Sequence, residues 1–317
     1  MSKASTRLKK SNKSKQLFCL FAAVFFSVSA VCAAQEKKSE DPLHVQTITA
    51  DNVAGIREIF RANGYKTYRN GPDYEIPPLM VQNFPKDISS ITDEKERHEF
   101  FIQLLAPLVL EANRKISLER EEILKFAKLK SLNAKQKEYL EKMAEKYDVF
   151  TRLKGDTRTR YLLKALKEKV DIITPSLVIG VSAIETNWGE NRIAPEGNAL
   201  FKEVVWHTDE GLKPRGETED DTYRIKTYPN LYAAVESFML KMNSSVDFAD
   251  MRSLRKSISK RKKLVEGRTM AHTMLFKSPL ENYIGMLDYI ITFYDMIAVD
   301  KSVLKNVESQ KDAEKKK

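Results

Sequence analysis

The chain has 317 residues and a formal net charge of +10, with 42% hydrophobic and 31% charged residues. This length is long for one compact domain and suits two domains, or one domain with extensions. The hydrophobic residues supply a sizeable core, while the charged fraction and a mean hydropathy of -0.44 favour a soluble mature protein over an integral membrane protein.

The first 34 residues are typical of a secretory signal. A basic region with six Lys or Arg residues and no acidic residue precedes an apolar run from Leu17 to Ala34. Small residues at its end allow cleavage after Ala33 or Ala34. We therefore predict a signal peptide over 1–34 and a periplasmic or secreted protein. An uncleaved membrane anchor is the alternative, because eighteen residues lie at the short edge of what spans a bilayer.

Both cysteines, Cys19 and Cys32, lie inside the predicted signal. The cleaved protein would therefore have no disulfide, cysteine nucleophile or cysteine ligand. Lipidation of Cys32 is disfavoured, because Val31 is a poor residue at the preceding position. Removal of the signal lowers the formal net charge from +10 to +4, because the signal carries six basic residues. This weakens a nucleic-acid interpretation and suits an anionic polymer instead.

The next segments are predicted to be a linker over 35–50 and a helical N-terminal region over 51–170. The linker is polar and charged. A short helix begins near Asp51, and a long helix begins at Thr92–Glu94, where Pro107 could kink it without ending it. Amphipathic helices rich in Lys and Glu follow at Glu119–Leu129, Ala134–Tyr147 and Arg158–Val170.

Residues 174–191 carry the most informative pattern. Thr174 can cap a helix, and Pro175 suits the first turn. Gly189 offers a C-terminal stop. Four apolar residues at helical spacing form one stripe on this predicted helix: Leu177, Val181, Ile184 and Trp188.

Glu185 lies beside this apolar stripe. A carboxylate at the edge of a buried face is costly unless it is protonated or paired. We therefore expect a raised pKa for Glu185, which is the condition for a general acid near neutral pH. The alternative is a structural ion pair with a distant Arg or Lys, since such pairs also perturb acids.

A small β-rich lobe or hairpin is predicted after this helix. Residues 199–228 contain few apolar residues and several Gly and Pro breakers, bounded by Val204–Trp206 and Tyr223–Tyr228. A helix then resumes at Leu231–Met242. The basic stretch 252–263 could contact an anionic glycan, although a solvated helix face is favoured.

The chain closes with a helix over Asn282–Val299 and a charged tail over 301–317, which we expect to be frayed.

The segment Ala183–Gly189 reads Ala-Ile-Glu-Thr-Asn-Trp-Gly. It resembles the Ala-x-Glu-Ser-x-Trp-Gly signature of the glucosaminidase domains of glycoside hydrolase family 73. Further residues resemble the Bax-like branch of that family: Asn198–Phe201, Trp206, Gly211 with Pro214, and 233–243. The resemblance covers roughly Pro77 to Val299. It implies a mainly α, lysozyme-like glucosaminidase domain over 171–300, with a small β lobe and a helical N-terminal extension.

The resemblance also implies an endo-β-N-acetylglucosaminidase that cleaves peptidoglycan, with Glu185 as general acid. Glycoside hydrolysis usually needs a second carboxyl group, and Glu203, Glu217 and Glu219 are candidates that spacing does not rank. Aromatic rings suit sugar binding because an apolar pyranose face can stack on them. The predicted substrate-binding residues are Trp188, Asn198, Phe201, Trp206, Tyr228 and Phe276; for each aromatic residue, core packing is the competing interpretation.

Two positions depart from the family pattern. Lys202 follows Phe201 where the family usually has Gly. Phe276 stands where the family has a substrate-pocket Tyr, about seven residues before a second Tyr that resembles Tyr283. A lost hydroxyl could remove a hydrogen bond to the transition state. Two alternatives therefore stay open: an amidase-type wall hydrolase, and a non-catalytic peptidoglycan-binding protein, which Phe276 favours.

The sequence contains no motif for metal-dependent catalysis, for a serine hydrolase or for phosphate binding. The four histidines lack metal-binding spacing, and neither a Gly-x-Ser-x-Gly elbow nor a glycine-rich phosphate loop occurs. We therefore expect no metal ion and no cofactor. The expected partner is peptidoglycan, without nucleic acid, and with a membrane only if the signal stays uncleaved. A monomer is expected.

Overall fold

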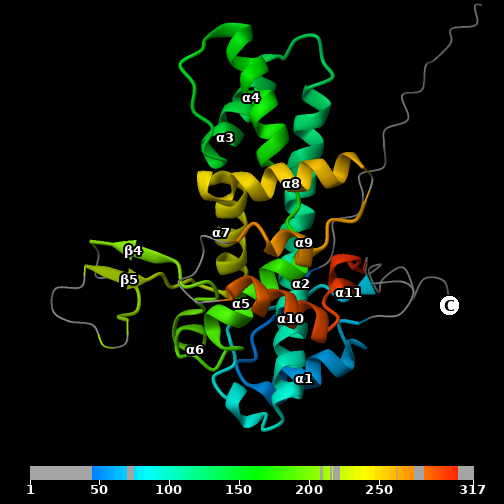
Figure 1. Ribbon diagram of the computed structural model, residues 1–317, viewed down its shortest axis with the longest axis vertical. Helices are drawn as coiled ribbons and strands as arrows, with labels where there is room; N and C mark the ends of the chain where they lie inside the picture. The colour runs from blue at the N-terminus through cyan, green and yellow to red at the C-terminus, as the bar shows by residue number, and fades with distance from the viewer. Residues whose placement is uncertain are drawn as a thin grey trace, which may run out of the picture. The chain divides into compact units, whose positions relative to one another are not determined.

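The computed structural model describes residues 45–69, 75–207, 210–214, 216, 222–261, 263–274 and 282–305. The predicted signal over 1–34, Phe276, Glu217 and Glu219 lie outside the described residues. The chain divides into Met1–Pro42 and Leu43–Lys317, and every described element belongs to the second unit. Within this unit helices predominate, so the mainly α prediction is confirmed (Figure 1).

The unit begins with β1 (Gln46–Ile48) and α1 (Val53–Ala62). The Asn52 side chain accepts a hydrogen bond from the Gly55 N–H at 2.8 Å and so caps α1. Strand β1 falls within the predicted linker, and it pairs in parallel with β3 (Leu79–Val81). Three residues are too few to show a strand period, so sequence pattern did not reveal this pairing.

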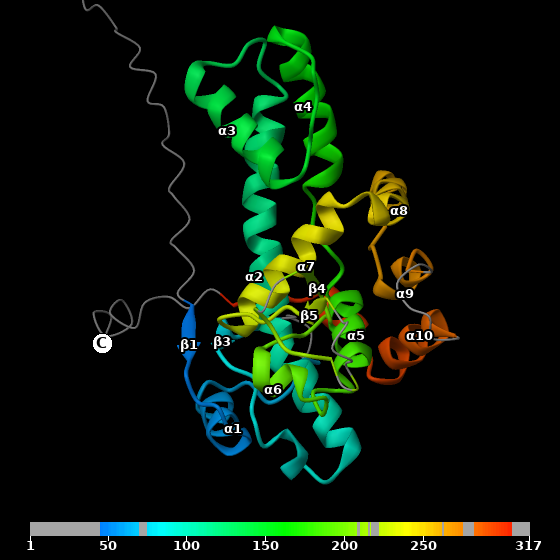
Figure 2. The same ribbon diagram turned by 90° about the vertical axis from the view of Figure 1, so that its left-hand side faces the viewer.

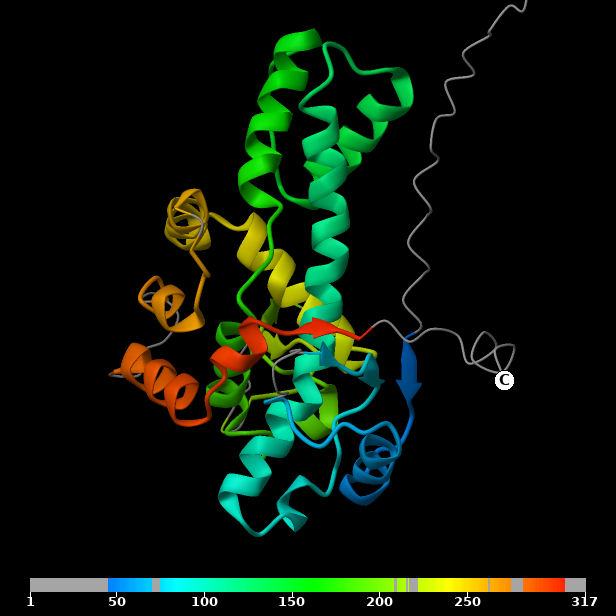
Figure 3. The ribbon, with the colours of Figure 1, turned by 90° about the vertical axis from the view of Figure 1, so that its right-hand side faces the viewer.

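A second short parallel pair joins an early segment of the chain to the C-terminal end of the described residues. Strand β2 (Glu75–Ile76) pairs with β6 (Val303–Leu304), which lies in the predicted tail. Figure 3 shows β6 beside the early strands. The single turn η1 (Ile88–Ser90) follows β3. The tail therefore contributes a strand before it leaves the described residues.

Helix α2 (Glu94–Phe126) is the longest element, with 33 residues. The Asp93 side chain accepts from the Glu96 N–H at 2.7 Å, and Pro107 lies inside the helix without ending it, as predicted. The helix predicted to begin at Glu119 is instead the last part of α2. Helices α3 (Ala134–Lys146) and α4 (Gly155–Lys169) pack beside this end of α2 (Figure 2).

Helix α5 (Pro175–Thr186) lies in the centre of the packing. Every residue from Pro175 to Ala183 is buried, so the predicted single apolar stripe understates its burial. Helices α2, α9 (Gly267–Ala271), α10 (Tyr283–Phe293) and α11 (Ile297–Asp300) contact it. A helix that is apolar on all faces belongs in a core.

The N-terminus of α5 is held by Asp300, not by Thr174. The Thr174 side chain makes no capping hydrogen bond to the described residues. One Asp300 oxygen accepts from the Ser176 N–H at 2.7 Å, and the other accepts from Ser176 Oγ at 2.7 Å and the Gly267 N–H at 3.1 Å. The prediction that Thr174 caps α5 was wrong, because the group that accepts the hydrogen bond at this end is the Asp300 carboxylate. Asp300 lies 124 residues from Ser176 in the chain.

The predicted β hairpin is confirmed. After α6 (Ile193–Gly197), strand β4 (Val204–Trp206) pairs in antiparallel register with β5 (Tyr223–Ile225). Helix α7 (Leu231–Ser244) follows, close to the predicted bounds, and packs against α2. The β lobe therefore connects the end of α6 with α7.

The prediction that the basic stretch forms a solvated helix face is only partly correct. It begins after the turn η2 (Val246–Phe248) as α8 (Ala249–Lys260), but Arg252 and Arg255 on it are buried. Arg252 Nη1 donates to the Met242 carbonyl at 2.9 Å, and Arg255 Nη1 donates to the Asp171 carbonyl at 3.1 Å. These two arginines are structural.

The predicted closing helix is broken in two. Helix α10 ends at Phe293, and Asp295 has a φ of 48° before α11 begins. The break turns the chain so that Asp300 reaches α5. Among the described helices, none combines the length and hydropathy needed to span a bilayer.

Burial raises the pKa of Asp300 to about 6, from an ordinary value of 3.8. The folded state therefore holds this proton more tightly than the unfolded chain. The stabilisation is fully present below about pH 4 and is lost as the pH rises through about 6. In free energy of unfolding the loss is about 3 kcal/mol at most.

We expect Asp300→Asn to remove this component, so that the unfolding free energy falls less between pH 4 and pH 7 than in the wild type. Urea denaturation at several pH values measures the difference. Asp250→Asn is the control, because Asp250 is exposed on α8. Equal pH slopes for wild type and Asp300→Asn would contradict this account.

Candidate active site

Helix α5 ends in an unusual backbone turn. Asn187, Trp188 and Gly189 have φ values of 48°, 56° and 86°, all in the left-handed region. Thr186 Oγ1 donates to the Ser182 carbonyl at 2.7 Å and accepts from the Gly189 N–H at 3.0 Å. A Cβ atom on Gly189 would collide with the Phe84 ring. Gly189 is therefore needed for this close approach, while Asn187 is the C-cap.

Trp188 packs the end of α5 against α2. Its ring stacks on His98 with centroids 3.9 Å apart and meets Phe101 and Tyr294 edge-on. His98 Nδ1 lies 2.6 Å from the Tyr294 hydroxyl, and burial lowers the pKa of His98 to about 4. The imidazole is thus neutral at pH 7. Trp188 thus packs against three aromatic rings while remaining partly exposed.

Glu185 lies on the last turn of α5, and its side chain is 15% exposed. Its Oε2 is 3.7 Å from Lys202 Nζ. Tyr283, at the start of α10, lies near it: burial raises the pKa of the Tyr283 phenol, and the Glu185 carboxylate raises it further. The buried Tyr283 hydroxyl has no partner in good hydrogen-bond geometry within the described part of the chain. The Tyr283 phenol and the Glu185 carboxylate therefore interact electrostatically.

The Glu185–Lys202 pair is not a structural anchor. Its separation is long for an ion pair, and the Lys202 side chain is 43% exposed. Solvent at the exposed Lys202 ammonium screens the attraction. The alternative reading of Glu185 as a purely structural carboxylate is therefore poorly supported by this pair.

Lys202 occupies a backbone position that favours glycine. Its φ is 44°, a left-handed conformation that costs a residue with a Cβ roughly 1–2 kcal/mol. This gives a physical reason for the glycine usual in the resembling family. In this chain the lysine at that position brings an ammonium group to Glu185. The sequence shows that Lys202 replaces the usual glycine, but it does not reveal the contact between Lys202 and Glu185.

Glu203, the one described candidate for a second carboxyl group, already has partners at both oxygens. Its Oε2 accepts from the Tyr228 hydroxyl and from Ser237 Oγ, and its Oε1 lies 3.8 Å from Lys241 Nζ. Burial and the neighbouring carboxylate raise the pKa of the Tyr228 phenol. The structure thus brings Tyr228 and Glu203 together in a cluster that ties the β lobe to α7.

Two further predicted substrate residues also have structural contacts. Asn198 accepts from the Phe84 N–H at 3.0 Å and donates to the Tyr228 carbonyl at 3.3 Å. Phe201 is 3% exposed and stacks on Phe238 with centroids 4.1 Å apart. Phe201 is thus buried in packing, whereas Asn198 is partly exposed.

Trp206 differs from these residues. It lies on β4, is 60% exposed, and has its ring centroid 5.4 Å from that of Tyr223. Among the predicted aromatic residues that the structure describes, it offers the most accessible ring face. An accessible indole suits stacking against a sugar.

Comparisons with known proteins agree with the central motif. Residues 161–287 match the family model Glucosaminidase, described as mannosyl-glycoprotein endo-beta-N-acetylglucosaminidase. Protein bax of Escherichia coli (strain K12) is 23% identical over 192 residues, which are 59% of this chain and 66% of that protein. The match thus spans just under two thirds of the relative's length.

A solved structure, the catalytic domain of the autolysin Auto from Listeria monocytogenes, covers 60% of this chain and 97% of its own, with 15% identity and a TM-score of 0.28. The matched segment 161–287 contains α5, Glu185, Lys202 and Tyr283. This part of the chain is thus similar to the glucosaminidase domain family.

Proposed function

We propose that this protein is a peptidoglycan hydrolase that cleaves the glycan strand at N-acetylglucosamine, with Glu185 as general acid. One observation carries the proposal: a mostly buried carboxylate stands at the end of α5, in the family signature and within the matched segment. A mostly buried carboxyl group is suited to hold a proton near neutral pH. Glu185 would donate this proton to the leaving glycosidic oxygen as the glycosidic bond breaks.

The Glu185 side chain is mostly buried, and the Lys202 ammonium lies 3.7 Å from its Oε2. A nearby cation favours the carboxylate over the protonated acid. Tyr283 lies close enough for the carboxylate to affect its phenol. Because the oxygens of Glu203 already have partners, the proposal assigns a catalytic role to Glu185 alone.

We expect Glu185→Gln to lower hydrolysis of purified peptidoglycan at least about a hundredfold, because an amide cannot donate the proton. The digest is reduced with borohydride and analysed by mass spectrometry, with wild-type products ending in reduced N-acetylglucosamine. Glu190→Gln is the matched control: Glu190 lies in the turn directly after α5 and pairs with Arg97 at 3.2 Å.

Other outcomes would select a different function. Released stem peptides without new reducing ends would indicate an amidase. Absence of any products from the wild type, with binding to peptidoglycan intact, would indicate a binding protein. Full activity in Glu185→Gln would remove Glu185 from the mechanism.

We expect Lys202→Ala to move the alkaline limb of the pH–rate profile upward by about 0.5 pH unit, because loss of the ammonium favours the protonated acid. Lys202→Arg keeps the charge and should leave the limb in place. Rates on peptidoglycan between pH 4 and pH 9 measure the shift. A downward shift in Lys202→Ala, or equal shifts in both variants, would contradict the assigned role.

We also propose that the protein acts outside the cytoplasm, because residues 1–34 have the pattern of a secretory signal. Expression of the full chain in a Gram-negative host should yield an extracytoplasmic protein whose N-terminal residue, determined by mass spectrometry, is Ala34 or Gln35. Recovery of an intact Met1 N-terminus in the membrane fraction would indicate the anchor instead.

A further inference from the structure

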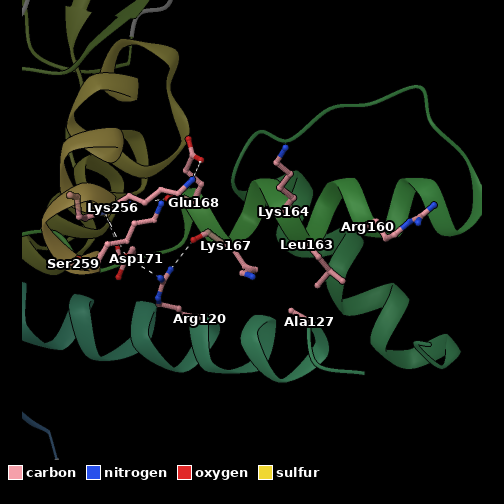
Figure 4. Close-up of a pocket in the computed structure, with 12 residues that line it drawn as sticks. Arg120, Ala127, Arg160, Leu163, Lys164, Lys167, Glu168, Asp171, Lys256 and Ser259 are labelled. Atoms are coloured by element: carbon pink, nitrogen blue, oxygen red, sulfur yellow. Dashed lines mark hydrogen bonds and ion pairs between the residues drawn. The ribbon is translucent and has the colours of Figure 1, made fainter. Parts of the chain in front are cut away.

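A cavity of about 670 Å³ opens between α2, α4 and α8 (Figure 4). It lies at the opposite end of α5 from Glu185, since its wall includes Asp171, which precedes the helix. The stretch from Pro175 to Glu185 is about 15 Å long. The cavity is therefore separate from the candidate active site, and its volume lies in the usual range for ligand pockets.

The wall of this cavity has an excess of positive charge, with seven cationic and two acidic residues. The two acids are already neutralised. Asp171 Oδ2 is 3.2 Å from Arg120 and 3.9 Å from Arg255, and Glu168 Oε2 is 2.7 Å from Lys256 Nζ. Figure 4 shows Lys256 reaching from α8 to Glu168 on α4.

Four cations remain after these pairs: Arg160, Lys164 and Lys167 on α4, and Lys260 on α8. No hydrogen bond or ion pair joins their side-chain nitrogens to another residue in the described ranges. The α4 residues are spaced four and three positions apart, which places them on one helix face. Like charges at this spacing destabilise a helix by about 0.2–0.5 kcal/mol per pair. An anion in the cavity would remove this repulsion.

The spread of these cations favours a ligand with more than one negative group. From Arg160 to Lys167, α4 rises about 10 Å, so several anionic groups along a ligand would engage these cations better than a single carboxylate or phosphate. Leu163 and Ala127 supply an apolar part of the wall, and this suits a ligand with carbon chains between its anionic groups. A peptide with several carboxylates has this chemistry.

We propose that this cavity is a second binding site for the wall polymer and takes the carboxylates of its peptide stems. This inference rests on the proposed function for the identity of the polymer. A long polymer can occupy the cavity and the Glu185 site together, which raises the apparent affinity without any new contact at the site of cleavage.

The test measures binding in the Glu185→Gln background, so that the polymer stays intact. Purified peptidoglycan is sedimented with the protein, and the dissociation constant is obtained at two salt concentrations. Arg160→Gln, Lys164→Gln and Lys167→Gln are combined in one variant. The matched control removes the same charge from exposed lysines near and on α3, as Lys130→Gln, Lys135→Gln and Lys137→Gln.

We expect the cavity variant to bind peptidoglycan at least tenfold more weakly, while the control variant binds as before. Peptidoglycan whose carboxylates have been amidated should be bound weakly by the parent and be insensitive to the cavity substitutions. Thermal unfolding verifies that both triple variants are folded. Because the readout is binding, a failure of hydrolysis in the wild type would leave this result interpretable.

Three results would overturn the inference. Equal weakening in the cavity and control variants would indicate attraction by net charge alone. Unchanged affinity for amidated peptidoglycan would exclude carboxylate recognition. Binding to vesicles of phosphatidylglycerol that depends on the cavity residues, without such dependence for peptidoglycan, would assign the cavity to a lipid phosphate.

Discussion

Burial of α5 from Pro175 to Ala183 is the constraint on which the rest of the structure depends. A buried helix terminus loses the water that would satisfy its free N–H groups, and the Asp300 carboxylate takes the place of that water at Ser176. At the other end, Trp188 packs against His98, and Gly189 admits the Phe84 ring. Both ends are thus fixed to other elements, so Glu185 projects from a rigid support.

A fixed helix end has a chemical consequence. A carboxyl group that already stands in place needs little reorganisation when it donates a proton, which is the condition for efficient catalysis. The Glu185 side chain is 15% exposed, and the Lys202 ammonium lies 3.7 Å from it. The strained backbone at Lys202 is in keeping with this interpretation, because strain persists where the surroundings fix a residue and is frequent at functional sites.

Elements set by local pattern were predicted from the sequence, whereas those set by distant partners were not. The long helix α2, the β4–β5 hairpin and α7 follow from periodicity and turn residues. The parallel pairs β1–β3 and β2–β6 have two or three residues each, and each forms only because a remote strand covers it. At the site, the motif predicts Glu185 as the acid, but it could not separate packing residues such as Trp188 from an exposed ring such as Trp206.

The basic stretch on α8 shows why charge along a sequence does not reveal function. Its arginines turn inward, where the guanidinium fork of Arg255 donates to several backbone carbonyls. Its lysines turn to the cavity, where Lys256 neutralises Glu168 and Lys260 has no such partner within the described residues. Arginine suits buried carbonyls because it presents several donors in one plane, whereas lysine keeps a compact, hydrated charge. Residue type thus separates the buried arginines of α8 from the lysines that line the cavity.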